Sequence, residues 1–245
     1  IIAIVASELG KAVSKETRVD ILVTPLVTIF SGVGLSMLIA APIGAAASQV
    51  GTLIMWATEQ APLVMGILVS VIVGVALTLP ISSAAICAAL GLTGLAGGAA
   101  VAGCCAQMIG FAVMSYKENG VGGLVSQGLG TSMLQMGNIV KNPRIWIAPT
   151  LASAITGPLA TCVFHFEMNG AAVSSGMGTC GLVGQIGVYT GWVSDIAAGV
   201  KTAITPMDWA AMVLLCFVLP AVLSVIFCEI ERKMGWIKEG DLKLN

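Results

Sequence analysis

Residues 21–116 read ILVTPLVTIFSGVGLSMLIAAPIGAAASQVGTLIMWATEQAPLVMGILVSVIVGVALTLPISSAAICAALGLTGLAGGAAVAGCCAQMIGFAVMSY, and Glu59 is the one formal charge among them. Soluble domains carry about 25% charged residues, whereas the whole chain carries 9% and is 57% hydrophobic. An unpaired charge in the middle of a bilayer costs about 3 kcal/mol. The sequence therefore predicts an all-α, polytopic integral membrane protein with about five to seven transmembrane helices, including broken helices and re-entrant segments.

Four apolar stretches have the length of a membrane-spanning helix, which needs about 20 residues. Prolines and glycines interrupt the first stretch, and membrane helices tolerate them where neighbouring helices satisfy the freed backbone groups. Pro80 ends the second stretch, because proline lacks the N–H and its ring clashes with the preceding turn. The predicted spans are residues 21–46, 61–79, 145–166 and 210–230.

Two further stretches are less regular. Residues 81–116 are too long for one ordinary span and contain a glycine tract, so we expect two short helices in a hairpin. Residues 119–140 are uncharged and glycine-rich. For this second stretch two interpretations remain open: a re-entrant segment that lies against protein or a water-filled cavity, or an amphipathic helix at the membrane surface.

Lysine and arginine gather in three places, which are the strip before the first span, residues 117–144 and the segment after the last span. The positive-inside rule then places the N-terminal strip and the short C-terminal tail, residues 231–245, in the cytoplasm. We treat residues 1–245 as a single membrane domain. Ile1–Ala6 has the composition of the end of an apolar helix, so we expect the chain to be the C-terminal part of a longer one.

The composition argues against several other functions. The seven cysteines include no C-x-x-C pair and the chain has one histidine, so we expect cysteines that pack in the interior rather than a metal site or disulfides. A net charge of −1 gives no basic surface for nucleic acid. No phosphate-loop pattern and no Ser-His-Asp set is present. We therefore expect no cofactor, no metal and no catalytic residue.

The most site-like stretch is VFHFEMNGAAVSSGMGTCGLVG, residues 163–184. It places the single histidine, an acid, an amide and two hydroxyls at the end of a predicted span. Ionisable groups at membrane depth usually have a function, and such groups pair well with the hydroxyls of a sugar. The alternative is a solvated helix end at the headgroup level. The candidate binding residues here are His165, Glu167, Asn169, Ser174, Ser175 and, just beyond the stretch, Gln185.

A second polar stretch is QGLGTSMLQMGN, residues 127–138. Its amides and hydroxyls either line a path for substrate or join helices through hydrogen bonds worth about 0.6 kcal/mol each. Gln135 and Asn138 are the candidate binding residues from this stretch. Together with the previous set they predict a site between the glycine-rich loop 170–191 and residues 119–140.

Three stretches together resemble the membrane (IIC) component of bacterial phosphotransferase-system transporters, in particular the IIC-like family that includes perfringolysin (toxin) regulators. They are LPISSAAICAALGLTGLAGGAA at 79–100, GNIVKNPRIWIAPTLASAITGP at 137–158 and NGAAVSSGMGTCGLVGQI at 169–186. The resemblance implies a helical permease for a sugar or polyol, a homodimer in the bacterial inner membrane. It also implies IIA and IIB components as partners, which supply the phosphotransfer chemistry that this chain lacks.

Two alternatives to sugar transport stay open. One is a membrane sensor or regulator that has kept the transporter fold and signals through a partner. The other is a transporter of another small metabolite that does not couple transport to phosphorylation. Fold alone does not separate these functions, because function depends on the site and its partners.

Overall fold

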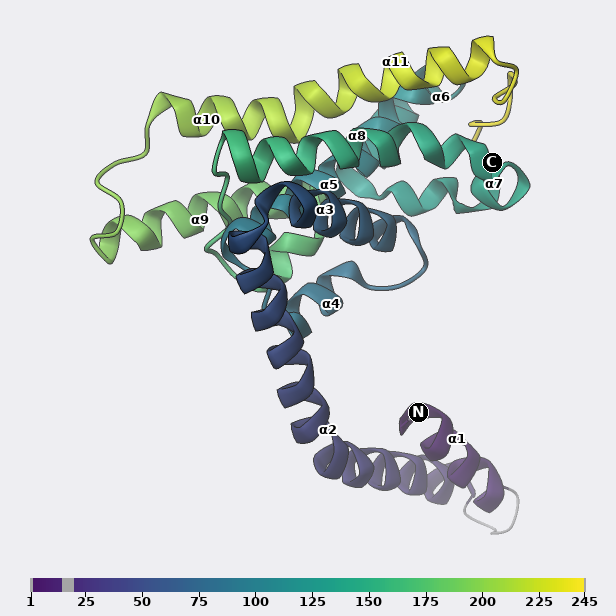
Figure 1. Cartoon of the computed structure of the whole chain (residues 1–245). Helices are drawn as coiled ribbons and strands as arrows, with labels where there is room; N and C mark the ends of the chain where they lie inside the picture. The colour runs from purple at the N-terminus through teal and green to yellow at the C-terminus, as the bar shows by residue number, and fades with distance from the viewer. Residues whose placement is uncertain (1, 15–19, 245) are drawn as a thin grey trace. The chain divides into compact units, whose positions relative to one another are not determined.

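The computed structural model describes residues 2–14 and 20–244, and every regular element in them is helical (Figure 1). This confirms the all-α class. The α-helices are α1 (Ile2–Val13), α2 (Asp20–Gln60), α3 (Pro62–Thr78), α4 (Ser83–Leu90), α5 (Gly94–Met114), α6 (Tyr116–Val125), α7 (Met136–Lys141), α8 (Ile147–Pro158), α9 (Val183–Ala197), α10 (Pro206–Val213) and α11 (Leu219–Lys233).

Short 3-10 and π turns connect or extend several of these helices. They are η1 (Ser126–Gly130), η2 (Ser132–Gln135), η3 (Pro143–Trp146), η4 (Leu159–Val163), η5 (Ala172–Gly176), η6 (Cys180–Leu182) and η7 (Leu214–Val218).

The chain divides into two compact units, residues 1–49 and 50–245. Within the first unit α1 packs against the first part of α2, where Ala6 is 5% exposed and Gly10 lies against the side chain of Thr28. The predicted first span falls inside α2, which continues through both of its prolines. Lys15 and Arg18 of the predicted charged strip lie outside the described residues.

Three helical stretches in the described part of the chain are long and apolar enough to cross a membrane. They are Gly94–Met114, Pro143–Val163 and Pro206–Lys233, with two shorter apolar helices at Val23–Met37 and Pro62–Thr78. The last two long stretches coincide with predicted spans, and α3 ends before Pro80 as expected. Large apolar side chains are exposed on the outer helices, for example Ile72 at 63%. The protein is therefore a polytopic membrane protein.

Helix α5 forms the centre of the second unit. Helices α3, α8 and α11 pack around it, and nearly all of its side chains are buried. Glycines bring the backbones of these helices close together: a Cβ on Gly74 or Gly103 would meet the backbone of the other helix, and the same is true of Gly66 and Gly157 between α3 and α8. Small residues at helix contacts are what allows close packing in a membrane, where no hydrophobic effect drives helices together.

A buried amide links the same helices. Gln107 of α5 accepts hydrogen bonds from the Trp146 indole at 3.0 Å and the Thr78 hydroxyl at 3.3 Å, and its amide nitrogen donates to Thr150 at 3.2 Å. The Thr78 hydroxyl also pairs with that of Ser132 at 2.9 Å. Each polar atom of Gln107 is therefore satisfied by a neighbouring element, and Gln107 holds α3, α5 and the η3–α8 stretch in register.

The hairpin of two short helices expected in residues 81–116 is only partly correct. The stretch forms the short α4 and then the full-length α5. Gly91 ends α4 in a left-handed conformation with φ of 63°, as glycine commonly does at a helix end. Gly94 begins α5 with a φ of 62°. Gly97, Gly98 and Gly103 lie inside the helix and do not break it, because backbone of neighbouring segments fills the space that their missing side chains leave.

Residues 119–140 are a broken helical segment packed against protein. α6 is interrupted at Gly120, where φ is 58°, and is followed by the π turn η1 and the 3-10 turn η2 before α7 begins. Gln127, Ser132 and Gln135 are fully buried in it. Irregular backbone in a membrane protein needs such internal partners, and this segment has them; that it re-enters the membrane stays a prediction.

The last span is continuous from α10 to α11 but contains the π turn η7, which ends two residues before Pro220. Proline cannot donate the next hydrogen bond of the helix and its ring clashes with the carbonyl four residues earlier. A wider turn at that point relieves the clash while the helix continues. The last predicted span therefore carries one local defect at its proline.

The close contact at Gly103 leads to a first prediction. In Gly103→Ala the new methyl group meets the backbone of Ser70 rather than a flexible side chain, so α3 and α5 must separate. Overpacking of this kind costs about 3 kcal/mol, which lowers the thermal midpoint in detergent by about 6–12 °C. The matched control is Gly137→Ala in α7, where the methyl group has nothing within 4 Å. Equal midpoints for the two variants would contradict this account of the core.

Candidate functional site

An extended stretch, residues 166–168, holds the predicted acid Glu167 in place. Met168 and Gly94 exchange two backbone hydrogen bonds of 3.0 Å, which attaches residues 166–168 to the first turn of α5. A Cβ on Gly98 would overlap with the carbonyl of Phe166. The glycine tract at the start of α5 is therefore what lets this stretch lie directly on the helix, and Glu167 projects from it.

The loop that follows Met168 lies directly against α9, again because glycines leave room for its backbone. A Cβ on Gly191 would meet the backbone of Asn169 at 2.8 Å, and a Cβ on Gly187 would meet the side chain of Ser174. On the other side of the loop, Gly178 lies against Cys104 of α5. The many glycines of this region therefore allow close packing on helices.

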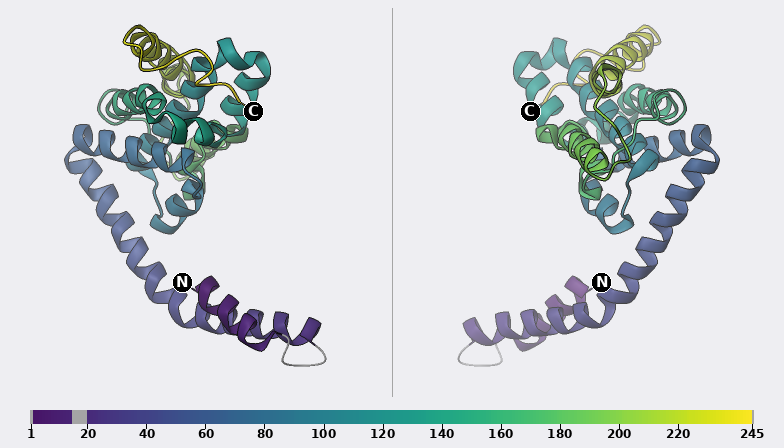
Figure 2. Two further views of the ribbon diagram at one scale, coloured as in Figure 1. Left: turned by 90° about the vertical axis from the view of Figure 1, so that its right-hand side faces the viewer. Right: turned by 90° about the vertical axis from the view of Figure 1, so that its left-hand side faces the viewer.

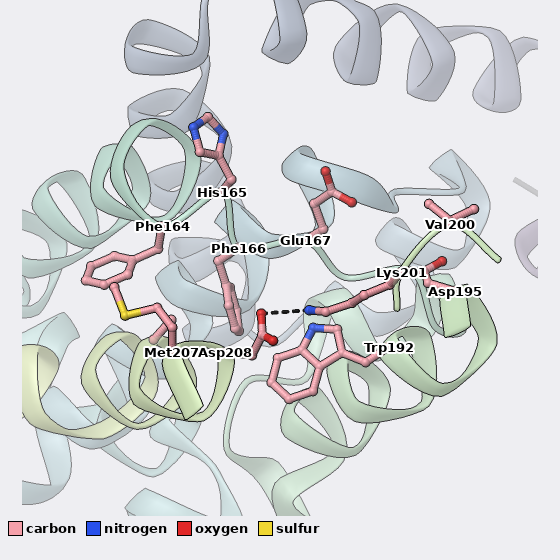
Figure 3. Close-up of a pocket in the computed structure, with 11 residues that line it drawn as sticks. Phe164, His165, Phe166, Glu167, Trp192, Asp195, Val200, Lys201, Met207 and Asp208 are labelled. Atoms are coloured by element: carbon pink, nitrogen blue, oxygen red, sulfur yellow. Dashed lines mark ion pairs between the residues drawn. The ribbon is translucent and has the colours of Figure 1, made fainter. Parts of the chain in front are cut away.

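A cavity of about 240 Å³ opens beside this stretch (Figure 3). The residues that line it come from the stretch after η4, from α9, from the loop between α9 and α10 and from the start of α10. They include His165, Phe166, Glu167, Trp192, Asp195, Lys201 and Asp208. The cavity therefore combines aromatic surface with three carboxylates and one ammonium group.

The ammonium group of Lys201 is held at the centre of this cavity. Its Nζ lies 2.7 Å from Oδ1 of Asp208 and 5.2 Å from the centre of the Trp192 ring, and Figure 3 shows the ion pair beside the indole. Asp208 is fixed in turn by a capping box with Thr205 at the start of α10. Both charged side chains are about three-quarters buried, so solvent screens this pair less than one on an open surface.

Asn169 connects the other two acids. Its amide nitrogen donates to Oε2 of Glu167 at 3.0 Å and to Oδ2 of Asp195 at 2.9 Å. One amide thus serves two carboxylates, and neither acid forms an ion pair with another of the described residues. This arrangement leaves carboxylate oxygens free to accept hydrogen bonds from a ligand.

His165 lines the cavity but is exposed to its surroundings. Its backbone has φ of 44°, in the left-handed region, which is uncommon for a residue other than glycine. The turn at His165 redirects the chain from the π turn η4 into the extended stretch that carries Glu167. His165 and Glu167 therefore lie together at the end of the span, as the sequence predicted.

The remaining predicted residues of the loop lie behind the cavity rather than in it. Ser175 is fully buried and donates to the carbonyl of Leu92 at 2.7 Å, and Ser174 is buried beneath α9. Gln185 donates to the Cys105 sulfur at 3.2 Å, while its amide oxygen is buried with no hydrogen-bond partner among the described residues. In this conformation these three side chains support the loop.

Gln135 and Asn138 lie in a different place, against the C-terminal segment. Gln135 donates to the carbonyl of Leu242 and Asn138 to that of Lys243, both at 3.0 Å. The two predicted halves of the site do touch, because Thr179 of the loop donates to the carbonyl of Gly128. The structure does not, however, bring Gln135 and Asn138 to the cavity that contains Glu167.

Four residues of the cavity were missed in the sequence: Trp192, Asp195, Lys201 and Asp208. A signal was present for one of them, because Lys201 is the single lysine or arginine between Arg144 and the last span. Asp208 also follows Thr205 and Pro206 in the pattern of a helix start. Nothing in the sequence shows that this helix start faces the turn at His165.

Comparison with known proteins gives the family. A family model described as "Phosphotransferase system, EIIC" matches residues 1–244. The chain therefore belongs to the EIIC family of the phosphotransferase system, the class of membrane permeases. Searches of the curated proteins and of the solved structures found no match to this chain.

The role of Asn169 can be tested directly. Asn169→Asp replaces a donor that serves two carboxylates by a third carboxylate, so both hydrogen bonds are lost and like charges face each other. Hydrogen bonds to charged groups contribute about 1.5–3 kcal/mol, and the thermal midpoint is expected to fall by about 4–10 °C. Gln60→Glu makes the same amide-to-carboxylate change at an exposed position and is expected to leave the midpoint within about 2 °C.

Proposed function

We propose that this chain is the permease of a phosphotransferase-type transporter whose substrate is an unphosphorylated sugar or polyol, and that the cavity around Glu167, Trp192 and Lys201 binds it. Membership of the EIIC family gives the permease role. The observation that supports the substrate class is the composition of the cavity: an indole that forms one wall, with carboxylates and an ammonium group around it. Sugars present apolar C–H faces together with hydroxyls that both donate and accept hydrogen bonds, and such a lining complements both.

The balance of charge favours a substrate without a phosphate. Lys201 is already paired with Asp208, whereas Glu167 and Asp195 share one neutral amide. The uncompensated charge of the cavity is therefore negative. An anionic ligand would meet like charge, which raises its binding free energy, whereas a neutral polyhydroxy compound donates hydrogen bonds to the free carboxylate oxygens.

The same proposal includes the partners of the chain, its oligomeric state and its location. The family implies IIA and IIB components as partners, and we propose a homodimer in the bacterial inner membrane. The charge distribution supports a cytoplasmic location for the N-terminal strip and for the C-terminal tail. Transfer of phosphate to the substrate is assigned to the partners, and this chain contributes binding and passage.

Ligand-dependent stability of the purified full chain in detergent tests the proposed site. A ligand that binds only the folded state stabilises it by about 2.7 kcal/mol at a concentration of 100 times Kd, which corresponds to a shift in midpoint of about 5–10 °C. A panel of sugars, polyols and their phosphates is screened, and the expected result is a dose-dependent shift from an unphosphorylated member. Glu167→Gln is expected to reduce the apparent affinity at least about tenfold, the loss of one charged hydrogen bond.

The control is Glu239→Gln, which removes a carboxylate at an exposed position away from the cavity and should leave the shift unchanged. A sugar that stabilises wild type and Glu167→Gln equally would show that Glu167 does not bind the substrate, while the proposed substrate class would still hold. Preference for a sugar phosphate would contradict the charge argument. No shift from any member of the panel would favour a sensor or a different substrate.

A further inference from the structure

The segment after α11 is folded back onto the broken segment 116–142, as Figure 2 shows for the yellow end of the chain. We call residues 236–244 the strap. Two of its apolar side chains are buried, Ile237 at 3% and Leu242 at 0% exposed, and both join an apolar cluster with Phe111, Ile145 and Cys228. Lys238, Glu239 and Lys243 of the strap are exposed.

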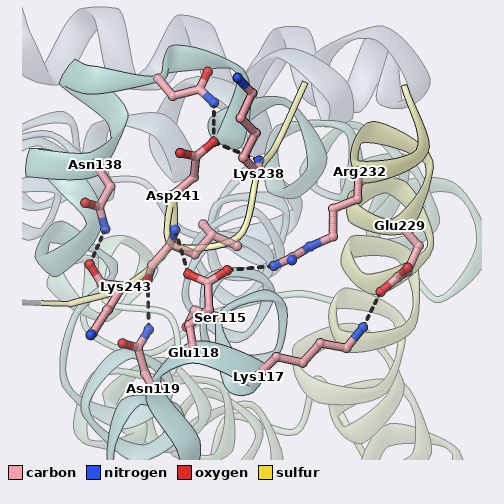
Figure 4. A network of polar contacts seen from close by, with 12 residues as sticks. Ser115, Lys117, Glu118, Asn119, Asn138, Glu229, Arg232, Lys238, Asp241 and Lys243 are labelled. Atoms are coloured by element: carbon pink, nitrogen blue, oxygen red, sulfur yellow. Dashed lines mark hydrogen bonds and ion pairs between the residues drawn. The ribbon is translucent and has the colours of Figure 1, made fainter. Parts of the chain in front are cut away.

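Side chains of the broken segment hold the strap mainly through its main chain (Figure 4). The Asp241 side chain of the strap also accepts from the amide of Asn142 at 2.9 Å. Asn119 makes two of the main-chain contacts at 2.8 Å, donating to the carbonyl of Leu242 and accepting from the amide of Leu244. Glu118 accepts from the amide of Leu242 at 2.8 Å. The carbonyls of Leu242, Lys243 and Trp236 accept from the amides of Gln135, Asn138 and Asn142.

This pattern is the chemistry of a peptide-binding groove. Main-chain hydrogen bonds give such grooves affinity for an extended segment largely independent of its sequence, and pockets for a few side chains add specificity. Here Ile237 and Leu242 occupy the apolar positions. The groove, which we define by Glu118, Asn119, Gln135, Asn138 and Asn142, thus has the chain's own C-terminal segment as its ligand.

The strap is attached in a way that permits release. Gly235 and Gly240 have φ of 72° and 93°, conformations open to glycine that let the chain reverse direction beside α11 and within the strap. Docking buries two apolar side chains, whereas α5 is enclosed along its whole length. Segments with few buried apolar contacts open locally at much lower free energy than the core.

The groove is also linked to the rest of the broken segment. Gln135 donates to the amide oxygen of Gln127 at 2.9 Å, and Gln127 donates to the hydroxyl of Ser115 at 2.7 Å. Glu118 joins the strap to α11 as well, because it pairs with Arg232 at 3.0 Å. Loss of the strap leaves Gln135 and Asn138 without their carbonyl partners, and these two side chains lie in η2 and α7.

From these observations we propose that the strap is a releasable latch: residues 236–244 bind as an intramolecular peptide ligand in the groove, and their undocking frees η2 and α7 to move. The occupant of the groove is the chain's own segment. An extended segment of a partner protein is the kind of ligand that would compete with it, since the groove recognises main chain. This proposal does not depend on the substrate of the cavity.

Hydrogen–deuterium exchange of the purified full chain in detergent tests the latch. The amides of Leu242 and Leu244 report docking directly, since both donate to the groove. In wild type they are expected to exchange at least about tenfold slower than in a free peptide of the strap sequence, yet at least about tenfold faster than the amides of α5. Asn119→Ala removes two contacts and is expected to accelerate both amides, and those of η2 and α7, at least about tenfold while α5 stays unchanged.

Lys243→Ala is the matched control, because that side chain is exposed and the groove binds only the carbonyl of this residue. It should leave the exchange rates unchanged. Acceleration equal to that of Asn119→Ala would overturn the assignment of a groove that reads main chain. Wild-type strap amides that exchange as slowly as α5 would show a fixed part of the fold, and amides that exchange as fast as the free peptide would show no docking. Either result, obtained without any variant, would overturn the latch.

Discussion

The structure depends on the close approach of helix backbones around α5. In a bilayer no hydrophobic effect drives helices together, so they associate through packing and hydrogen bonds. Glycines at 66, 74, 103 and 157 remove the side chains that would keep α3, α5 and α8 apart. The short distance between the helices lets the side chain of Gln107 form hydrogen bonds to both α3 and the η3–α8 stretch. The hydrogen bonds of Gln107 depend on this close backbone contact, because a larger residue at Gly103 would separate α3 from α5 and move the bonded groups apart.

Close contacts at glycines also position the candidate site. Gly98 admits the carbonyl of Phe166 to the surface of α5, and the paired hydrogen bonds between Gly94 and Met168 fix the register of the stretch that carries Glu167. Gly191 brings α9 onto Asn169 in the same manner. The acids of the cavity are thus placed by main-chain contacts on rigid helices, the arrangement that holds a binding site most accurately.

Much of this could be predicted from the sequence because charge and length decide membrane spans almost by themselves. The stretch from His165 to Asn169 was also recognisable, since three polar side chains alternate with apolar ones within five residues at the end of a predicted span. Lys201 and Asp208 were not, because their meeting with Glu167 depends on how α9 and α10 return to the end of the earlier span. The glycines of α5 were misread as a break for a related reason. A glycine in sequence indicates either a turn or a close contact, and only the neighbouring helix shows which.

The two ends of the second unit are built differently, and this bears on which part moves. The stretch that carries Glu167 is placed by backbone packed on backbone, where a shift requires α5 or α9 to separate from it. The broken segment 116–142 is held instead by side-chain amides and carboxylates that grip the main chain of the strap, and such contacts can be replaced one by one by water. A permease must pass its substrate without dismantling its core. This difference supports the proposed latch, in which the scaffold around α5 stays fixed and the segment held by exchangeable side-chain contacts moves.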